Sequence, residues 1–172
     1  MKNLIAFAIL LVSAFAISAQ ERTFLQKIEG KWEGTLEYSD YKTEKRVSLK
    51  TTLEIKASAD GKSAEFFYVY DDFGKIIKET DEVRIDPVNK KFYFGEDEFS
   101  LEESGGKLVL FGKQIDNDKP EPVRKTIIFT VDSLQILKET RTPFQFRNVY
   151  NFKRVGGDKD KCEPGAIGSV SR

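Results

Sequence analysis

Apolar and polar residues alternate with a period of two through most of the chain between Arg22 and Arg154. Successive side chains of a β-strand point to opposite faces, so this alternation predicts strands with one buried face. The clearest case is residues 46–57, where apolar residues and threonine alternate with charged and polar residues. The 3.6-residue period of a helix is hardly sustained, and only residues 22–28 are expected to form a short helical or irregular turn. The pattern therefore predicts an all-β protein.

Short segments rich in Gly, Pro, Asp and Asn separate ten candidate strands and leave no room for crossover helices. Only residues 116–122, rich in Asp, Asn and Pro, are expected to form a longer loop. Such a chain predicts an antiparallel up-and-down meander closed into a barrel of 8–10 strands, with a β-sandwich as the alternative. The candidate strands are residues 31–39, 46–57, 63–70, 75–85, 91–94, 98–103, 107–115, 123–131, 134–139 and 144–154.

Residues 1–19 begin with one basic residue, continue as an apolar run and end in small residues. This composition predicts a secretory signal peptide cleaved near Ala19, and so a secreted or periplasmic protein. The run is shorter than the roughly 20 residues needed to cross a bilayer, and no second run follows, so no integral membrane span is expected. The remaining chain is expected to form one β-barrel domain at 20–154 and a disordered C-terminal tail at 155–172.

Charge and cysteine content narrow the classes of partner. Without Lys2 the chain has 28 − 1 = 27 basic residues against 28 acidic ones, so neither nucleic acid nor another highly charged partner is expected. Cys162 is the only cysteine, which excludes an internal disulfide and leaves the core to stabilise the fold. Cys162 either pairs between chains or is an unselected residue of the tail.

The sequence contains no histidine. This excludes Ser-His-Asp and Cys-His catalytic sites and imidazole metal ligands. Acidic and amide residues at 71–72 and 116–118 stand in turns, where they are used for backbone hydrogen bonds, and they lack the spacing of a calcium loop. No nucleotide-binding motif is present. The chain is therefore expected not to be an enzyme and to need no metal or cofactor.

Gly30-Lys31-Trp32 follows the short turn at 22–28 and opens a strand in which Trp32, Gly34 and the apolar residues after them share one face. This element resembles the opening motif of the lipocalins and of the wider calycin superfamily, and the overall layout is similar to that of secreted lipocalin-like proteins of unassigned function. The resemblance implies a barrel in which a basic side chain of the last strand packs over Trp32 and closes one end. Arg147 and Arg154 are the two candidates for that side chain.

The resemblance also implies a small apolar or amphipathic ligand inside the barrel. Aromatic residues are concentrated in the first two thirds of the mature chain, where tyrosine hydroxyls could supply oriented polar groups. The alternative is a filled barrel without ligand that acts through its surface as an interaction or structural module. The candidate ligand-binding residues are Tyr38, Tyr41, Phe66, Tyr68, Tyr70 and Arg147.

The last strand presents a conflict. Its aromatic residues alternate with a polar set that contains Arg147, and only one of the two sets can face the interior. If Arg147 faces inward, the aromatics form an outer surface for a protein partner; if the aromatics face inward, Arg154 is the partner of Trp32. The aromatic residues are Phe144, Phe146, Tyr150 and Phe152.

Overall fold

The computed structural model describes residues 22–156, except 44, 105 and 117. The expected signal peptide at 1–19, Cys162 and the tail from residue 157 onward lie outside the described residues. No helix in the described part of the chain is long and apolar enough to span a membrane.

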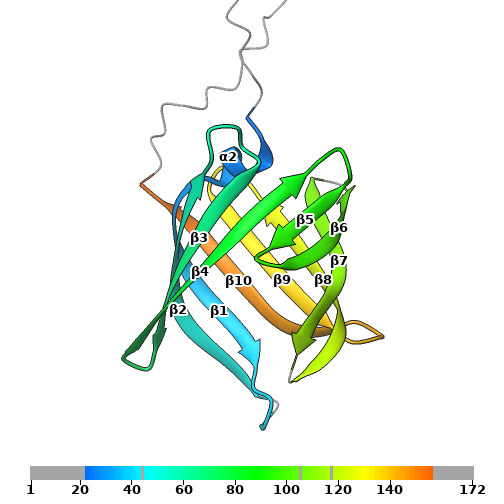
Figure 1. The fold of residues 1–172 in the computed structure, drawn as a ribbon. Coiled ribbons are helices and arrows are strands. Elements are labelled where there is room, and N and C mark those ends of the chain that lie inside the picture. The colour runs from blue at the N-terminus through cyan, green and yellow to red at the C-terminus, as the bar shows by residue number, and fades with distance from the viewer. Residues whose placement is uncertain (1–21, 44, 105, 117, 157–172) are drawn as a thin grey trace, which may run out of the picture.

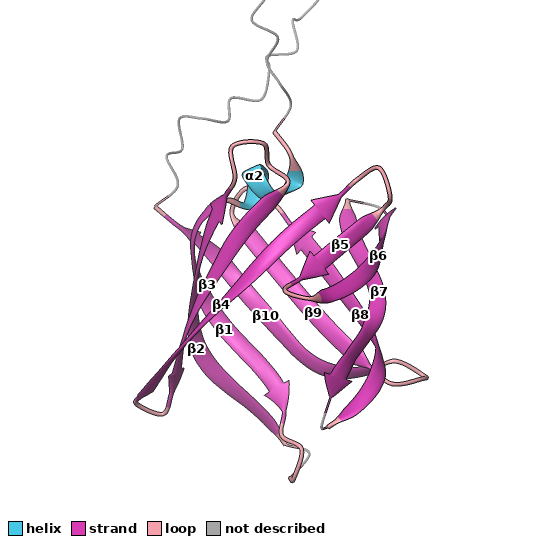
Figure 2. Cartoon of the chain, in the orientation of Figure 1, coloured by secondary structure: helices cyan, strands magenta, loops and turns pink. Residues whose placement is uncertain are grey.

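Ten antiparallel strands form a closed barrel with one short helix at one end (Figures 1 and 2). Each strand pairs with the next along the chain, and β1 pairs with β10, which confirms the meander and excludes the sandwich. The elements are α2 (Phe24–Ile28), β1 (Gly30–Ser39), β2 (Arg46–Ala57), β3 (Ser63–Asp72), β4 (Lys75–Asp86), β5 (Lys91–Phe94), β6 (Asp97–Ser104), β7 (Lys107–Asp116), β8 (Lys119–Phe129), β9 (Ser133–Thr140) and β10 (Gln145–Val155).

The expected loop at 116–122 is wrong, because β8 already begins at Lys119 and continues through Pro120 and Pro122. These prolines pair with β7, whereas β9 reaches only Val123 with its residue Thr140. The stretch therefore has a ladder neighbour on one side only, where a missing N–H is tolerated. Composition alone predicts a loop here, because it does not show that this part of β8 has a neighbouring strand on one side only.

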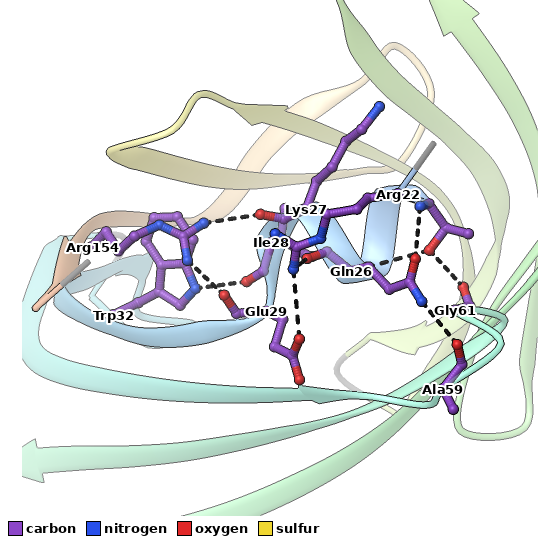
Figure 3. Close-up of polar contacts among 10 residues, drawn as sticks. Arg22, Gln26, Lys27, Ile28, Glu29, Trp32, Ala59, Gly61 and Arg154 are labelled. Atoms are coloured by element: carbon purple, nitrogen blue, oxygen red, sulfur yellow. Dashed lines mark hydrogen bonds and ion pairs between the residues drawn. The ribbon is translucent and has the colours of Figure 1, made fainter. Parts of the chain in front are cut away.

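The helix closes one end of the barrel. Thr23 caps it through a capping box with Gln26. Gln26 and Thr23 also donate hydrogen bonds to the β2–β3 turn, at the carbonyl oxygens of Ala59 (3.0 Å) and Gly61 (3.0 Å), as Figure 3 shows. Leu25 and Ile28 of the helix are buried in the core, together with Trp32 of β1. These contacts hold α2 over the barrel as a plug.

Arg154, and not Arg147, packs over Trp32. Its guanidinium carbon lies 4.1 Å from the indole centroid, and the two residues are direct partners in the β1–β10 ladder. Arg154 also donates hydrogen bonds to three backbone carbonyls, those of Val131 (2.7 Å), Glu29 (2.6 Å) and Lys27 (3.0 Å). The indole N–H of Trp32 donates to the carbonyl of Ile28 at 2.9 Å (Figure 3).

Gly30 makes room for this arrangement. Its φ is +128°, and a Cβ atom at this position would lie 2.9 Å from a guanidinium nitrogen of Arg154. Glycine is thus needed both for the backbone conformation and for the approach of the arginine. We name the set of Gly30, Trp32 and Arg154 the closing cluster.

A β-bulge in β10 resolves the conflict over its aromatic residues. The ladder with β9 shifts between Phe146 and Asn148, so the inward face changes at that point. Beyond the bulge Phe152 is buried and Tyr150 packs against the core. Before it, Phe146 lies under Arg46 on the outer side, and Phe144 lies under Arg124. Neither alternative therefore holds for all four aromatics, and no outward row of four forms.

The closing cluster provides a test of the closed end. Substituting Arg154→Ala removes the cation–π contact and leaves several carbonyls without this donor, so the free energy of unfolding is expected to fall by about 2–4 kcal/mol. Arg46→Ala, which removes a cation–π contact on the outer surface, is the matched control and is expected to change stability by less than about 1 kcal/mol. Urea denaturation measures both. Equal effects of the two substitutions would contradict the role of Arg154.

Candidate functional site

The side chains that point into the barrel change in character from one end to the other. Near α2 they are apolar and sealed: Trp32, Phe92 and Phe99 are each no more than 1% exposed. Toward the other end the same strand faces carry ionisable groups. The register places these inward groups on four strands, and they are Glu79 and Asp81 of β4, Asp116 of β7, Lys125 of β8 and Lys138 of β9. The open half of the lumen is therefore polar.

The wall of this open half is incomplete between β4 and β7. On the side away from β3, β4 pairs with β5 only from Val83 to Asp86, and β7 pairs with β6 only as far as Gly112. The facing stretches 75–81 and 113–116 have no ladder partner across this gap among the described residues. Glu79 and Asp81 are opposite the inward residues Tyr68 and Phe66, yet both are exposed. Solvent therefore reaches the lumen from this side.

Lys125 is the most unusual inward residue. It stands between the buried residues Val123 and Ile127, opposite Leu110 of β7. Its ammonium nitrogen lies 3.7 Å from the ring centroid of Phe94 and 4.9 Å from that of Phe99. Burial among these groups, together with the charge of its cross-strand partner Lys138, lowers the pKa of Lys125 to about 7.

Within the described chain the amine of Lys125 makes no hydrogen bond or ion pair. It is not sealed, however: the only fully buried side-chain oxygen or nitrogen that lacks a hydrogen bond in that part of the chain is Oε1 of Gln114. The amine therefore faces space that water can enter. Lys138 also has its pKa lowered by burial, and partial burial raises the pKa of Asp81. Three ionisable groups thus face the lumen in an environment that disfavours their charges.

Three tyrosines line the lumen beside the inward carboxylates of β4, and we name them the tyrosine layer. Tyr68 and Tyr70 come from β3 and Tyr150 from β10, across the lumen, with ring centroids 5.3 Å apart for Tyr68 and Tyr150. The hydroxyls of Tyr70 and Tyr150 are 3.1 Å apart. Burial raises the pKa of Tyr150 to about 12 and those of Tyr68 and Tyr70 further. All three are therefore neutral hydroxyls at physiological pH.

Arg147 lies at the mouth of the open end. Its guanidinium group contacts Asp116 of β7 at 3.2 Å, donates to the backbone carbonyl of Ser39, and stacks 3.6 Å from the ring centroid of Tyr41. The Tyr41 hydroxyl donates to the same carboxylate at 2.5 Å. We name Tyr41, Asp116 and Arg147 the rim cluster; it ties β10 and β7 to the loop after β1.

The sequence-predicted ligand residues occupy two levels of the lumen. Phe66, Tyr68 and Tyr70 are buried together on β3, and Tyr38 is half-buried on the inward side of β1. Tyr41 and Arg147 lie at the rim of the open end, separate from these residues. Arg147 is thus a rim residue and does not belong to the closing cluster.

Sequence reasoning missed Lys125, Lys138 and Asp81. The signal that could have found them is the alternation itself: Val123, Lys125 and Ile127 share one strand face, as do Ile136 and Lys138. A lysine at an apolar position of an alternating strand predicts an inward charge. The sequence analysis predicts polar groups inside the barrel from tyrosine and Arg147 alone.

Outside the lumen we looked for metal-ligand clusters and for depressions on the surface. Among the described residues no group of three or more His, Cys, Asp or Glu side chains is placed to hold a metal ion. Two open depressions lie outside the lumen. One is on the outer face of β1–β3, lined by residues such as Thr35, Lys50 and Val69, and the other lies between Phe24 of α2 and the β6–β7 turn.

Comparisons with known proteins support the fold. No family model and no curated protein matches the sequence. The structure is similar to that of a protein of unknown function from the DUF3598 family of Nostoc punctiforme, with a TM-score of 0.50 and 11% identity over 79% of this chain, which spans 51% of that protein. It is also similar to the N57A mutant of the fluorescent protein UnaG, with a TM-score of 0.49 and 11% identity over 76% of this chain and 98% of that one. At 11% identity the likeness concerns the fold alone.

The rim cluster predicts a coupled effect of two substitutions. Arg147→Ala leaves the buried carboxylate of Asp116, whose side chain is 4% exposed, without its cation. The free energy of unfolding is expected to fall by about 2–4 kcal/mol. Adding Asp116→Asn to that variant removes the unpaired charge and is expected to restore about half of the loss, as measured by urea denaturation in a double-mutant cycle. Additive losses would contradict the pairing.

The lowered pKa of Lys125 predicts a pH-dependent stability. Between pH 7 and about 10.5 the unfolded chain binds a proton at this position that the folded chain does not, so wild-type stability is expected to rise with pH over that window. Lys125→Met lacks this titration. The variant is expected to be more stable than the wild type below pH 7, by roughly 1–3 kcal/mol, and the difference should shrink toward pH 10. Lys153→Met, on the outer face, is the control, and a constant difference for Lys125→Met would refute the prediction.

Proposed function

We propose that the protein binds a small amphipathic molecule in the open half of its lumen. The observation that carries this proposal is the inward amine of Lys125, which has neither a hydrogen bond nor an ion pair within the described chain. In a filled barrel the cation–π contacts with Phe94 and Phe99 would have to compensate this charge, and an inward charge without a counter-ion lowers stability. A bound molecule with an electron-rich polar group would supply the missing partner.

The layers of the lumen match such a molecule. The apolar and aromatic side chains at the closed end, among them Phe66 and Phe99, suit a hydrocarbon or aromatic body. The tyrosine layer offers neutral hydroxyls that can donate or accept hydrogen bonds. Lys125 and Lys138 offer amines that can donate hydrogen bonds to a polar group of the ligand. The gap between β4 and β7 gives a route from solvent to these groups. The calycin-like fold is compatible with this use.

We further propose that binding takes place outside the cytoplasm and without catalysis. The signal-like composition of residues 1–19 supports export. The lack of histidine leaves no ordinary proton shuttle for a hydrolytic reaction. The surface-module alternative has less support, because the aromatic row that motivated it is divided between the inside and the outside of β10.

Titration with 1-anilinonaphthalene-8-sulfonate, an amphipathic anion whose fluorescence rises in apolar surroundings, tests the proposal. One molecule is expected to bind per chain. Replacing both Lys125 and Lys138 by Met is expected to weaken binding about tenfold or more, because the anion loses two inward cations, each worth on the order of 1 kcal/mol.

The control variant replaces Lys78 and Lys153 by Met, since both are exposed and point away from the lumen. It should bind the dye as the wild type does. Absence of stoichiometric binding, or equal weakening in both double variants, would refute binding in the lumen. If the dye binds as expected, mass spectrometry of molecules extracted from the purified protein would identify the natural ligand.

A further inference from the structure

We propose that Lys125 binds ligands covalently and reversibly, by forming an imine with an aldehyde or ketone group. This inference rests on the proposed function, because the carbonyl compound must first enter the lumen. It names the chemical class of one ligand that the open half of the lumen would retain.

The surroundings of Lys125 favour a neutral, nucleophilic amine. Its nitrogen lies over the rings of Phe94 and Phe99, which favour the ammonium form through cation–π contacts, but within the described chain it donates no hydrogen bond and makes no ion pair that would compensate its burial. Its cross-strand neighbour on β9 is a second lysine, Lys138. An apolar pocket and an adjacent cation are the two conditions that activate a lysine as a nucleophile toward carbonyl carbon.

The charged groups that face Lys125 come from three elements. Lys138 of β9 disfavours the ammonium form, whereas Asp81 of β4 and Asp97 of β6 favour it. Asp97 is engaged by the side-chain amide of Gln114 at 2.5 Å. Burial outweighs these charges, so about half of the Lys125 amines are neutral near pH 7, against roughly one in three thousand for an ordinary exposed lysine.

The reaction is balanced without an oxidant or a reductant. The lone pair of the Lys125 nitrogen forms a bond to the carbonyl carbon, and the carbon–oxygen π electrons move to oxygen. A proton transferred from nitrogen to that oxygen gives a carbinolamine. Loss of the hydroxyl group and of the remaining nitrogen proton as one water molecule gives the imine, and addition of water through the open end reverses the reaction.

The rest of the lumen fits the body of such a ligand. Tyr68, on the inward face of β3, lies in the tyrosine layer that borders the charged half, and Phe66 continues that face toward the closed end. An aromatic or hydrocarbon group could occupy this apolar side while its carbonyl group reaches the amine. The same enclosure slows hydrolysis by limiting the water around the product.

The experiment incubates the protein with 2-naphthaldehyde, reduces any imine with sodium cyanoborohydride, and locates the resulting secondary amine by peptide mass spectrometry. One naphthylmethyl group per chain is expected, on Lys125, with half-maximal labelling near pH 7. Lys125→Arg should abolish this labelling, and Lys153→Met should leave it unchanged. Lys138→Met should move the half-maximal pH upward, because it removes a nearby positive charge.

Binding of 2-naphthalenemethanol, which has the same ring system but no carbonyl group, separates this inference from the proposed function. If the alcohol binds in the lumen and the aldehyde labels only exposed lysines at alkaline pH, imine formation is refuted while lumen binding stands. If neither compound binds or labels Lys125, both proposals are refuted. Labelling of Lys125 in wild type and in Lys138→Met with the same pH profile would refute the activating role of Lys138.

Discussion

The contact between Arg154 and Trp32 sets the difference between the two ends of the barrel. The arginine joins the last strand to the first, and its hydrogen bonds to the carbonyls of Lys27 and Glu29 hold the end of α2 in the same place. Trp32 receives the guanidinium on its ring face and donates its own N–H to Ile28. With the helix fixed in this way, Leu25 and Ile28 exclude water from one end, and the interior beneath them is apolar. The opposite end has no comparable cover among the described elements, so its interior can carry charge.

The second constraint is the shortness of β5 and β6. Because β5 consists only of Lys91–Phe94, it pairs with β4 only from Val83 to Asp86. The stretch 75–81 of β4 is left without a neighbouring strand on that side. An inward carboxylate there, such as that of Asp81, keeps access to solvent. The charge of Asp81 acts on Lys125, whose amine lies on the rings of Phe94 and Phe99. Lys125 therefore lies at the boundary between the apolar half and the solvent-accessible half of the lumen. Its burial at this boundary lowers the pKa of its amine.

The alternation along the chain predicted the strands because each one has a buried and a solvated face, and the resemblance of Gly30 and Trp32 to a calycin opening predicted the closed end. Two features could not be predicted, because they depend on how neighbouring strands pair in the folded barrel. The stretch through Pro120 and Pro122 is a strand because β9 stops before reaching it, and the bulge before Asn148 reverses which side of β10 faces inward. The choice between Arg147 and Arg154 followed from that bulge. The predicted ligand residues are aromatic side chains and Arg147, so the prediction does not include Lys125.

The position of Lys125 also argues against treating the polar half of the lumen as incidental. An interior lysine at the level of a sealed core would be replaced by an apolar residue at no cost to folding, and its partners would close over the gap. Here the rim cluster engages the charges of Arg147 and Asp116 with each other, and Gln114 engages Asp97, so that three of the charged groups around the opening have side-chain partners. The amine of Lys125 remains outside these pairs, next to the apolar layer. An inward amine beside an apolar layer, with a second lysine as its cross-strand neighbour on β9, is what the proposed site for a polar or carbonyl group requires.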